Sequence, residues 1–245
     1  MKDLAIEVRA LSYAYPDGQM ALRDMNFTVH TGETVGVIGS NGAGKSTLLL
    51  HLNGVHQGSN GHVRVHDLPV TAPHLVAVRR LVGLVFQDPD DQLFMPTVQE
   101  DVAFGPMNMD LSEAEVQTRV AQALTTVGAS HLAPRAPYRL SGGEKRMVAI
   151  AGVLAMTPSV IVMDEPSAGL DPSARRRLIN LLGSLPQTKI IATHDLDLVS
   201  DVCSRVLVMC EGVVEADGPP EVIFANAELL SRCHLELPLG LQKHT

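Results

Sequence analysis

The sequence predicts an α/β fold with a mostly parallel central sheet, an antiparallel β subdomain near the N-terminus and an inserted helical subdomain. Short, nearly continuous apolar runs recur along the chain, as expected of strands that are buried on both faces of a parallel sheet. Helical stretches separate these runs, and polar or glycine-rich residues follow each run directly. At 245 residues the chain has the size of one α/β domain, which needs no disulfide or structural metal to be stable.

The strands are expected in two groups. Residues 4–9 and Leu22–Val29 alternate apolar and polar side chains on either side of a turn at Tyr15–Gly18, a pattern typical of antiparallel structure. Four later apolar runs are expected to form the parallel sheet: Thr34–Ile38, Leu81–Phe86, Val160–Met163 and Lys189–Thr193. Because the carboxyl ends of parallel strands lie along one edge of a sheet, the polar residues after these runs should surround one ligand.

The whole chain, residues 1–245, is expected to form one domain. Helical periodicity at Ser112–Val127 and Glu144–Ala155 predicts a helical subdomain over residues 87–154, because this segment is too long for a single crossover. The other segments are assigned to the α/β core, 1–86 and 155–224, and to a short C-terminal tail, 225–245.

Charge and cysteine content limit the possible partners and compartments. The chain has 19 basic and 27 acidic residues, a net charge of −8 and no basic stripe, so nucleic acid is not expected as a partner. Cys203, Cys210 and Cys233 are odd in number and have no CxxC spacing, which favours a reducing compartment, and they are expected to be small buried hydrophobes. Without an apolar stretch of about 20 residues or a signal peptide, the chain is expected to be cytoplasmic.

The segment Gly39–Ser46 matches the phosphate-loop pattern GxxxxGK[ST], and it lies between a predicted strand and an apolar helix. Its glycines let backbone N–H groups face a phosphate, Lys45 would reach the β and γ phosphates, and Ser46 would offer a hydroxyl to Mg²⁺. An ordinary glycine-rich turn would not require both residues at these offsets. The segment therefore predicts a P-loop NTPase whose nucleotide-binding residues are Gly39, Ser40, Asn41, Gly42, Ala43, Gly44, Lys45, Ser46 and Thr47.

The apolar run at Val160–Met163 ends in two adjacent carboxylates. Asp164 is expected to hold Mg²⁺, directly or through water, as in other P-loop nucleotidases. Glu165 would accept a proton from, or orient, the water that attacks the γ-phosphate. The alternative is a strand whose two terminal acids only face solvent.

The segment Leu140–Glu144 reads LSGGE and resembles the signature segment of ABC ATPases. Ser141 and Glu144 form a capping-box pattern, and the glycines between them would expose a helix N-terminus to an anion. The resemblance extends over essentially the whole chain, and it implies an ABC ATPase that binds ATP and Mg²⁺. It also implies that Ser141, Gly142, Gly143 and Glu144 cover the γ-phosphate held by the phosphate loop of a partner subunit.

Other segments resemble further motifs of this family. Gln87 resembles the glutamine that ligates Mg²⁺ and senses the transport subunits. His194 resembles the switch histidine that contacts the γ-phosphate, and Ser167–Asp171 resembles the D-loop at the dimer interface. Taken alone, His194 could be a satisfied histidine at a strand end. Tyr15 lies where ABC proteins commonly stack an aromatic ring on adenine, although a core role stays open because Tyr13 points to the same strand face. The resemblance thus implies that Glu165, His194 and Gln87 are catalytic and that Ser46, Gln87 and Asp164 bind the metal.

The segments Phe86–Phe94 and Thr97–Pro106 resemble the ATPases of energy-coupling-factor importers, in particular the cobalt and nickel branch. This resemblance implies import of cobalt, or else nickel, by a homodimer on the cytoplasmic face of the inner membrane. The implied partners are an integral membrane scaffold and a membrane substrate-binding component. A vitamin-type importer is the alternative; a soluble, non-transport ABC ATPase is disfavoured because the chain has neither a long heptad insertion nor a second ABC domain.

Two surface features are open to a functional and a structural interpretation. Asp88, Asp90 and Asp91 are hypothesised to meet basic residues of the membrane scaffold, and a solvated acidic turn is the alternative. His62 and His66 would lie on one face of an extended segment, but a metal site usually has three or four ligands, so direct binding of the transported metal is not expected.

Overall fold

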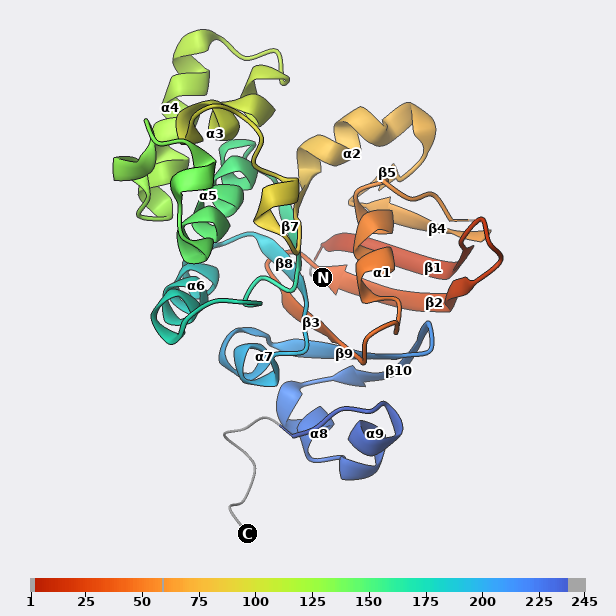
Figure 1. Ribbon diagram of the computed structural model, residues 1–245. Coiled ribbons are helices and arrows are strands. Elements are labelled where there is room, and N and C mark those ends of the chain that lie inside the picture. The colour runs from red at the N-terminus through yellow and green to blue at the C-terminus, as the bar shows by residue number, and fades with distance from the viewer. Residues whose placement is uncertain (1–2, 59, 238–245) are drawn as a thin grey trace.

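The computed structural model describes residues 3–58 and 60–237, and its larger sheet is mostly parallel, as predicted (Figure 1). This sheet has the order β10-β9-β3-β8-β7-β6, and all neighbouring strands are parallel except β10, which pairs antiparallel with β9. The strands are β3 (Thr34–Ile38), β6 (Val82–Val85), β7 (Val160–Asp164), β8 (Thr188–Ala192), β9 (Arg205–Cys210) and β10 (Val213–Gly218). The four predicted apolar runs therefore form the centre and one side of the sheet, with ends shifted by at most one residue.

The hairpin of β9 and β10 was not predicted from the sequence. Its two-residue turn has positive φ at both positions, 46° at Glu211 and 83° at Gly212, as a type I′ hairpin requires. Glutamate is an unusual residue at such a position, because hairpin turns of this type usually begin with asparagine, aspartate or glycine. The turn signal was therefore weak.

A second, antiparallel sheet contains the N-terminal strands, as predicted, and has the order β2-β1-β4-β5. The turn between the first two strands is closed by a hydrogen bond from the N–H of Gly18 to the carbonyl of Tyr15. Both strands are longer than the alternating segments that predicted them. The strands are β1 (Leu4–Ala14), β2 (Met20–His30), β4 (Asn60–Val65) and β5 (Leu68–Pro69).

The central sheet separates two hydrophobic cores. In β7 the side chains of Val160 and Val162 pack into a core shared with the antiparallel sheet and helix α1 (Lys45–Leu52), whereas Ile161 and Met163 pack into a second core with the helices between Val98 and Arg232. Because both faces of these strands are covered, apolar and polar residues do not have to alternate along them. This explains the continuous apolar runs in the sequence.

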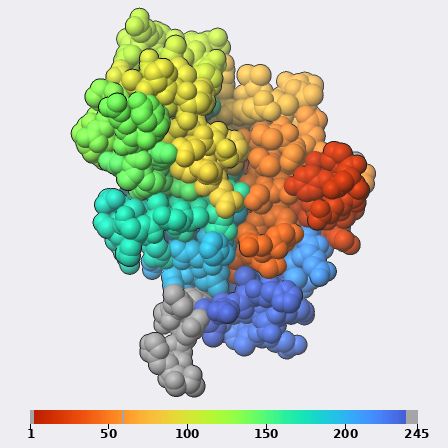
Figure 2. All heavy atoms as spheres, in the orientation of Figure 1, coloured from red at the N-terminus to blue at the C-terminus, as the bar shows by residue number. Residues whose placement is uncertain are grey.

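Three helices, α3 (Val98–Met107), α4 (Glu113–Thr126) and α5 (Gly142–Ala155), pack on one another and form a group that projects above the central sheet (Figures 1 and 2). Both predicted helices lie in this group, with Ser112 as the N-cap of α4. The limits of the helical subdomain, 87–154, and of the core and tail segments stay predictions.

The remaining helices cover the sheet and its ends. They are α2 (Leu75–Leu81), α6 (Pro172–Ser184), α7 (Leu196–Val202), α8 (Pro220–Phe224) and α9 (Ala227–Arg232), with short 3₁₀ turns η1 (Ala72–His74), η2 (Pro89–Asp91), η3 (Ser130–Leu132) and η4 (Pro137–Arg139). No helix in the described ranges is long and apolar enough to span a membrane.

Candidate active site

The carboxyl ends of the parallel strands meet around one cavity of about 350 Å³. The phosphate loop follows β3, the two carboxylates end β7, and His194 follows β8. The structure thus brings together residues that are more than 100 positions apart in the chain, as the parallel-sheet argument predicted. The cavity is lined by Tyr15, Gln19, Met20, Ala21, Asn41, Gly42, Gly44, Lys45, Ser46, Thr47, Gln87, Asp164, Glu165 and His194.

The phosphate loop depends on glycine for its backbone shape. Gly42 and Gly44 have φ values of 81° and 98°, and a β-carbon on Gly44 would lie 2.6 Å from the carbonyl oxygen of Ala21. Lys45 is buried, and its ammonium group donates hydrogen bonds to the carbonyls of Gly39 at 2.8 Å and Ser40 at 3.2 Å. Burial lowers the pKa of Lys45, while Glu165 and Asp164 oppose the shift.

Asp164 has the environment of a metal-binding carboxylate. Its Oδ1 atom is buried and has no hydrogen-bond partner, and burial raises its pKa although a hydrogen bond from Ser46 opposes this effect. A divalent cation would give the unpaired oxygen a partner and would neutralise the buried charge. The available donors are the Ser46 hydroxyl, the Asp164 carboxylate and the Gln87 side chain, and oxygen donors of this kind suit Mg²⁺. These residues therefore fit the metal that the sequence predicted.

Glu165 is held by several contacts from the loop after β8. Its backbone is in the left-handed region at φ 43°, a conformation that costs about 1–3 kcal/mol in a residue other than glycine. Its Oε2 atom accepts hydrogen bonds from Thr193 Oγ1 at 3.0 Å and from the His194 N–H at 3.2 Å, and it lies 2.8 Å from His194 Nδ1. The His194 side chain is 67% exposed, so its ring is free to turn towards a ligand.

Thr193 is a site residue that the sequence analysis missed. It is fully buried, it donates to Glu165, and its hydroxyl accepts a hydrogen bond from the N–H of Asp195 at 3.0 Å. A threonine at a strand end next to the proposed switch histidine was the available signal. Its role becomes clear only when β7 and β8 lie side by side.

Asp195 joins the loop of His194 to the segment that resembles a D-loop. Its carboxylate accepts a hydrogen bond from Ser167 Oγ at 3.0 Å and two from Arg175, both at 2.8 Å. The same carboxylate caps α7 by accepting from the N–H of Leu198. These hydrogen bonds lower the pKa of Asp195, whereas burial, the largest single effect, opposes the shift.

Of Tyr13 and Tyr15, only Tyr15 lines the nucleotide cavity. Its hydroxyl lies 2.7 Å from Thr47 Oγ1, which fixes the ring beside the phosphate loop. Tyr13 instead packs against the core between the sheets, with its ring centroid 4.7 Å from that of His51 and 5.1 Å from that of His56. Tyr13 therefore takes the core role, and Tyr15 keeps a position compatible with base stacking.

The signature segment is at the start of α5 and does not line the cavity. Its capping box is confirmed: the Glu144 N–H donates to Ser141 Oγ at 3.3 Å, and the Ser141 N–H donates to Glu144 Oε2 at 2.7 Å. These hydrogen bonds lower the pKa of Glu144. Within the described chain the signature and the phosphate loop do not form one site.

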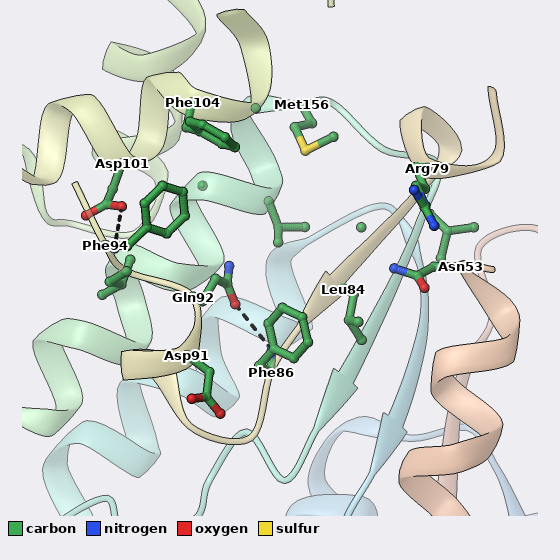
Figure 3. Close-up of a pocket in the computed structure, with 16 residues that line it drawn as sticks. Asn53, Arg79, Leu84, Phe86, Asp91, Gln92, Phe94, Asp101, Phe104 and Met156 are labelled. Atoms are coloured by element: carbon green, nitrogen blue, oxygen red, sulfur yellow. Dashed lines mark hydrogen bonds between the residues drawn. The ribbon is translucent and has the colours of Figure 1, made fainter. Parts of the chain in front are cut away.

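A groove of about 430 Å³ lies between the end of β6 and helices α3 and α5, as Figure 3 shows. Exposed aromatic side chains lie on one side of it, with Phe94 62% and Phe104 47% exposed and their ring centroids 4.9 Å apart. The carboxylate of Asp101, which the sequence analysis missed, holds the loop above α3 by accepting from the N–H groups of Phe94 and Met95, both at 3.0 Å. Burial raises the pKa of Asp101.

The three acidic residues of the turn after β6 are not equivalent. Asp88 caps η2, and Asp90 forms an ion pair with Lys145 at 2.6 Å. Asp91 is the one of the three that lines the groove in Figure 3. Asp90 is paired within the chain, yet its side chain is 62% exposed, so the hypothesis that the three acids meet basic residues of a membrane scaffold stays a prediction.

The expectations for cysteine and histidine are modified in two places. Cys203 and Cys233 are buried as expected, and burial raises the pKa of Cys203 to about 12, but Cys210 is only half-buried. His66 lies just beyond β4 at φ 49°, where its Nε2 lies 2.9 Å from Ser159 Oγ. In the described part of the chain, no three histidine, cysteine or acidic side chains are grouped so that they could hold a metal ion.

Several known proteins resemble this chain over most of its length. A family model described as ABC transporter matches residues 22–168. A putative ABC transporter ATP-binding protein of Geobacter sulfurreducens is 59% identical over 97% of this chain and 95% of its own length. The energy-coupling factor transporter ATP-binding protein EcfA of Methanothermobacter thermautotrophicus is 52% identical over 95% of this chain and 76% of its own length.

A solved structure has the same fold. It is cbiO1 from Clostridium perfringens, described as part of the ABC transporter complex cbiONQ, and it is 42% identical. The TM-score is 0.84, and the match covers 94% of each chain. From the phosphate loop, the paired carboxylates and these matches, we conclude that the chain belongs to the ABC transporter family, as a member that binds and hydrolyses ATP.

Proposed function

We propose that this chain is the ATP-hydrolysing subunit of an energy-coupling-factor importer for a transition-metal ion, cobalt or else nickel. The observation that carries this proposal is that one short segment serves two sites. Gln87 lines the nucleotide cavity, whereas Phe86 and Asp91 line the groove. A partner seated in the groove would thus act directly on the segment that reaches the nucleotide.

Similarity to EcfA and cbiO1 supports the importer class. The choice of cobalt or nickel rests on the resemblance of Phe86–Phe94 and Thr97–Pro106 to that branch. In the proposed complex the chain lies on the cytoplasmic face of the inner membrane, and a membrane scaffold places a helix in the groove. The exposed rings of Phe94 and Phe104 offer the apolar contact that such a helix needs.

ATP binding is assigned to the phosphate loop and Tyr15. The Lys45 ammonium exchanges the carbonyls of Gly39 and Ser40 for the β and γ phosphates, which relieves the cost of holding a buried cation against neutral groups. The ring of Tyr15, anchored through Thr47, stacks on adenine.

Hydrolysis is assigned to Glu165 and His194, with Ser46, Asp164 and Gln87 holding the metal. When bound, Mg²⁺ neutralises charge on the β and γ phosphates. Glu165 orients the attacking water and accepts its proton, and Thr193 fixes the carboxylate for this step. His194 turns from Glu165 towards the γ-phosphate, a movement that its exposed position permits.

A second copy of the chain completes the site. Ser141–Glu144 lies outside the cavity, so these residues would cover the nucleotide bound to another subunit. All the proposed catalytic and binding residues are present in this one sequence. Two identical chains therefore suffice to form two complete sites, and we propose a homodimer.

The test is transport by the complete complex. The chain is purified with its membrane partners, reconstituted in vesicles, and assayed for ATP-dependent uptake of cobalt and nickel. Glu165→Gln should lower the rate constant for hydrolysis by roughly 10²–10⁴-fold while ATP binding persists, since it removes only the proton acceptor. Uptake of a vitamin but neither metal would support the vitamin-type alternative, and an active ATPase that copurifies with no membrane protein would contradict the importer assignment.

A further inference from the structure

Arg146 is a buried cation to which the sequence analysis gave no role. It lies in the first half of α5 and is 2% exposed. Its two terminal nitrogens donate hydrogen bonds to consecutive carbonyls, NH1 to Phe86 at 2.7 Å and NH2 to Gln87 at 2.6 Å. One side chain of the signature helix therefore holds the backbone at the point where β6 ends and the Gln87 segment begins.

Stability alone does not explain an arginine at this position. Its Nε atom is buried without a hydrogen-bond partner, and within the described residues no carboxylate forms an ion pair with it. Burying a charge that has no ion-pair partner is costly, and Phe86 and Gln87 are exposed residues whose carbonyls water could bind if the arginine were absent. Ala149 and Ile150, three and four positions later on the same side of α5, are buried and apolar, so an apolar side chain would suit position 146.

The same segment has two further contacts with α5. Lys145 pairs with Asp90, and the side-chain amide of Gln92 donates to the carbonyl of Ala149 at 2.8 Å. Gln92 also accepts a hydrogen bond from the N–H of Phe86 at 3.2 Å, which closes the segment on itself. Residues 86–92 are thus attached to the helix that begins with the signature, with Arg146 as the buried contact.

Arg146 also lines a cavity of about 640 Å³ together with Ser46, Gln87 and Asp164, the proposed metal ligands. Its guanidinium group could act there in two ways: by its positive charge near Asp164, or by fixing the Gln87 backbone. The two short bonds to carbonyls favour the second, because a charge alone needs no such geometry.

We propose that Arg146 is a positioning residue for ATP hydrolysis, which fixes the Gln87 backbone to α5 so that Gln87 and the signature Ser141–Glu144 move as one rigid unit. Movement of a groove-bound partner would then reach both nucleotide sites of the dimer together. The inference rests on the proposed role of Gln87 as a metal ligand. It predicts that loss of Arg146 uncouples Gln87 from the helix without unfolding the protein.

The first test needs neither nucleotide nor Mg²⁺. Hydrogen exchange is measured on the full-length Arg146→Met protein, with Lys145→Met as the matched control that removes only the exposed ion pair. Amide exchange of residues 86–92 should increase about tenfold in Arg146→Met and less than about threefold in Lys145→Met, because bonds to a buried guanidinium stabilise more than an exposed pair does. The thermal midpoint should not fall. Unchanged amide exchange of residues 86–92 in Arg146→Met would refute the positioning role. So would a loss of thermal stability in this variant large enough to account for its loss of ATPase activity.

The second test is a double-mutant cycle on ATPase activity. Arg146→Met should lower kcat and raise the Mg²⁺ concentration needed for half-maximal rate by roughly 10–100-fold, as for other residues that orient metal ligands. In a Gln87→Ala background the same change should have less than about a twofold effect. Arg146→Lys, which keeps the charge but cannot bridge both carbonyls, should recover only part of the rate and remains informative if Arg146→Met does not fold. The proposal would be contradicted if the effects of Arg146→Met and Gln87→Ala on the ATPase rate multiplied in the double mutant, or if Arg146→Lys restored the full rate.

The two tests also separate this inference from the proposed function. If Gln87→Ala leaves the rate and the Mg²⁺ requirement unchanged, the role of Gln87 fails. The exchange experiment then still decides whether Arg146 holds residues 86–92.

Discussion

Replacing Thr193 by valine removes one hydroxyl from the centre of the active site and keeps the side-chain volume. That hydroxyl donates to the carboxylate of Glu165 and accepts from the N–H of Asp195, both at 3.0 Å. A hydrogen bond to a charged group contributes about 1.5–3 kcal/mol, and a buried N–H left without a partner costs about 1–3 kcal/mol. Because the Asp195 N–H is only partly buried, we expect the free energy of unfolding to fall by about 2–4 kcal/mol.

The measurement is urea unfolding of the nucleotide-free chain, followed by circular dichroism, with the slope of the transition compared between variants. Thr193→Ser is the control, since it keeps the hydroxyl and loses one methyl group, at a cost of about 1 kcal/mol. Thr193→Val should also lower the ATPase rate, because the carboxylate of Glu165 loses a contact that fixes its position. A valine variant as stable as the wild type, or no more destabilised than the serine variant, would refute this account of the hydrogen-bond network.

Three further predictions follow from the site. Burial raises the pKa of Asp164 in the folded state, so the ionised carboxylate opposes folding, and the stability of the protein falls as the pH rises above the pKa that Asp164 has in the unfolded chain. Asp164→Asn should therefore abolish ATP hydrolysis and yet raise the free energy of unfolding at pH 7 by roughly 1 kcal/mol. A lower thermal midpoint in this variant would contradict the prediction. Tyr15→Ala should raise the KM for ATP about tenfold by loss of stacking, whereas Tyr15→Phe, which keeps the ring and loses only the contact with Thr47, should raise it less; equal effects of the two would exclude stacking. Phe94→Asp should leave the ATPase rate of the isolated chain unchanged and reduce copurification of membrane partners at least tenfold; normal copurification would show that the groove is not the contact.

The proposed coupling and the proposed catalysis meet at residues 86–92. Asp91 lies in the groove, Gln87 lines the nucleotide cavity, and Arg146 holds the backbone between them to α5. Since Ser141 caps the same helix, a displacement of this segment also displaces the signature. A groove mutation and an Arg146 mutation should therefore differ: the first should affect only the assembled complex, the second also the isolated ATPase.

Local patterns explain why much of this protein could be predicted from its sequence. The phosphate loop is a contiguous segment whose glycines set the backbone conformation, and the capping box of Ser141 and Glu144 spans only three positions. The buried strands appear as apolar runs because both faces of the sheet are covered. The short turn of Glu211 and Gly212 is also local, but its residues give a weak signal, and β9 and β10 were missed.

The sequence by itself determined the α/β class, the phosphate loop, the two carboxylates and the family resemblance, since each depends on residues close together in the chain. Only the tertiary structure decided that Tyr13 packs in the core while Tyr15 faces the cavity, that Thr193 holds Glu165, and that Asp90 pairs with Lys145. It alone showed that Arg146 reaches the carbonyl of Gln87, 59 positions away. Such contacts join segments that only the packing of helices and strands brings together, and no periodicity or spacing in the chain encodes their geometry.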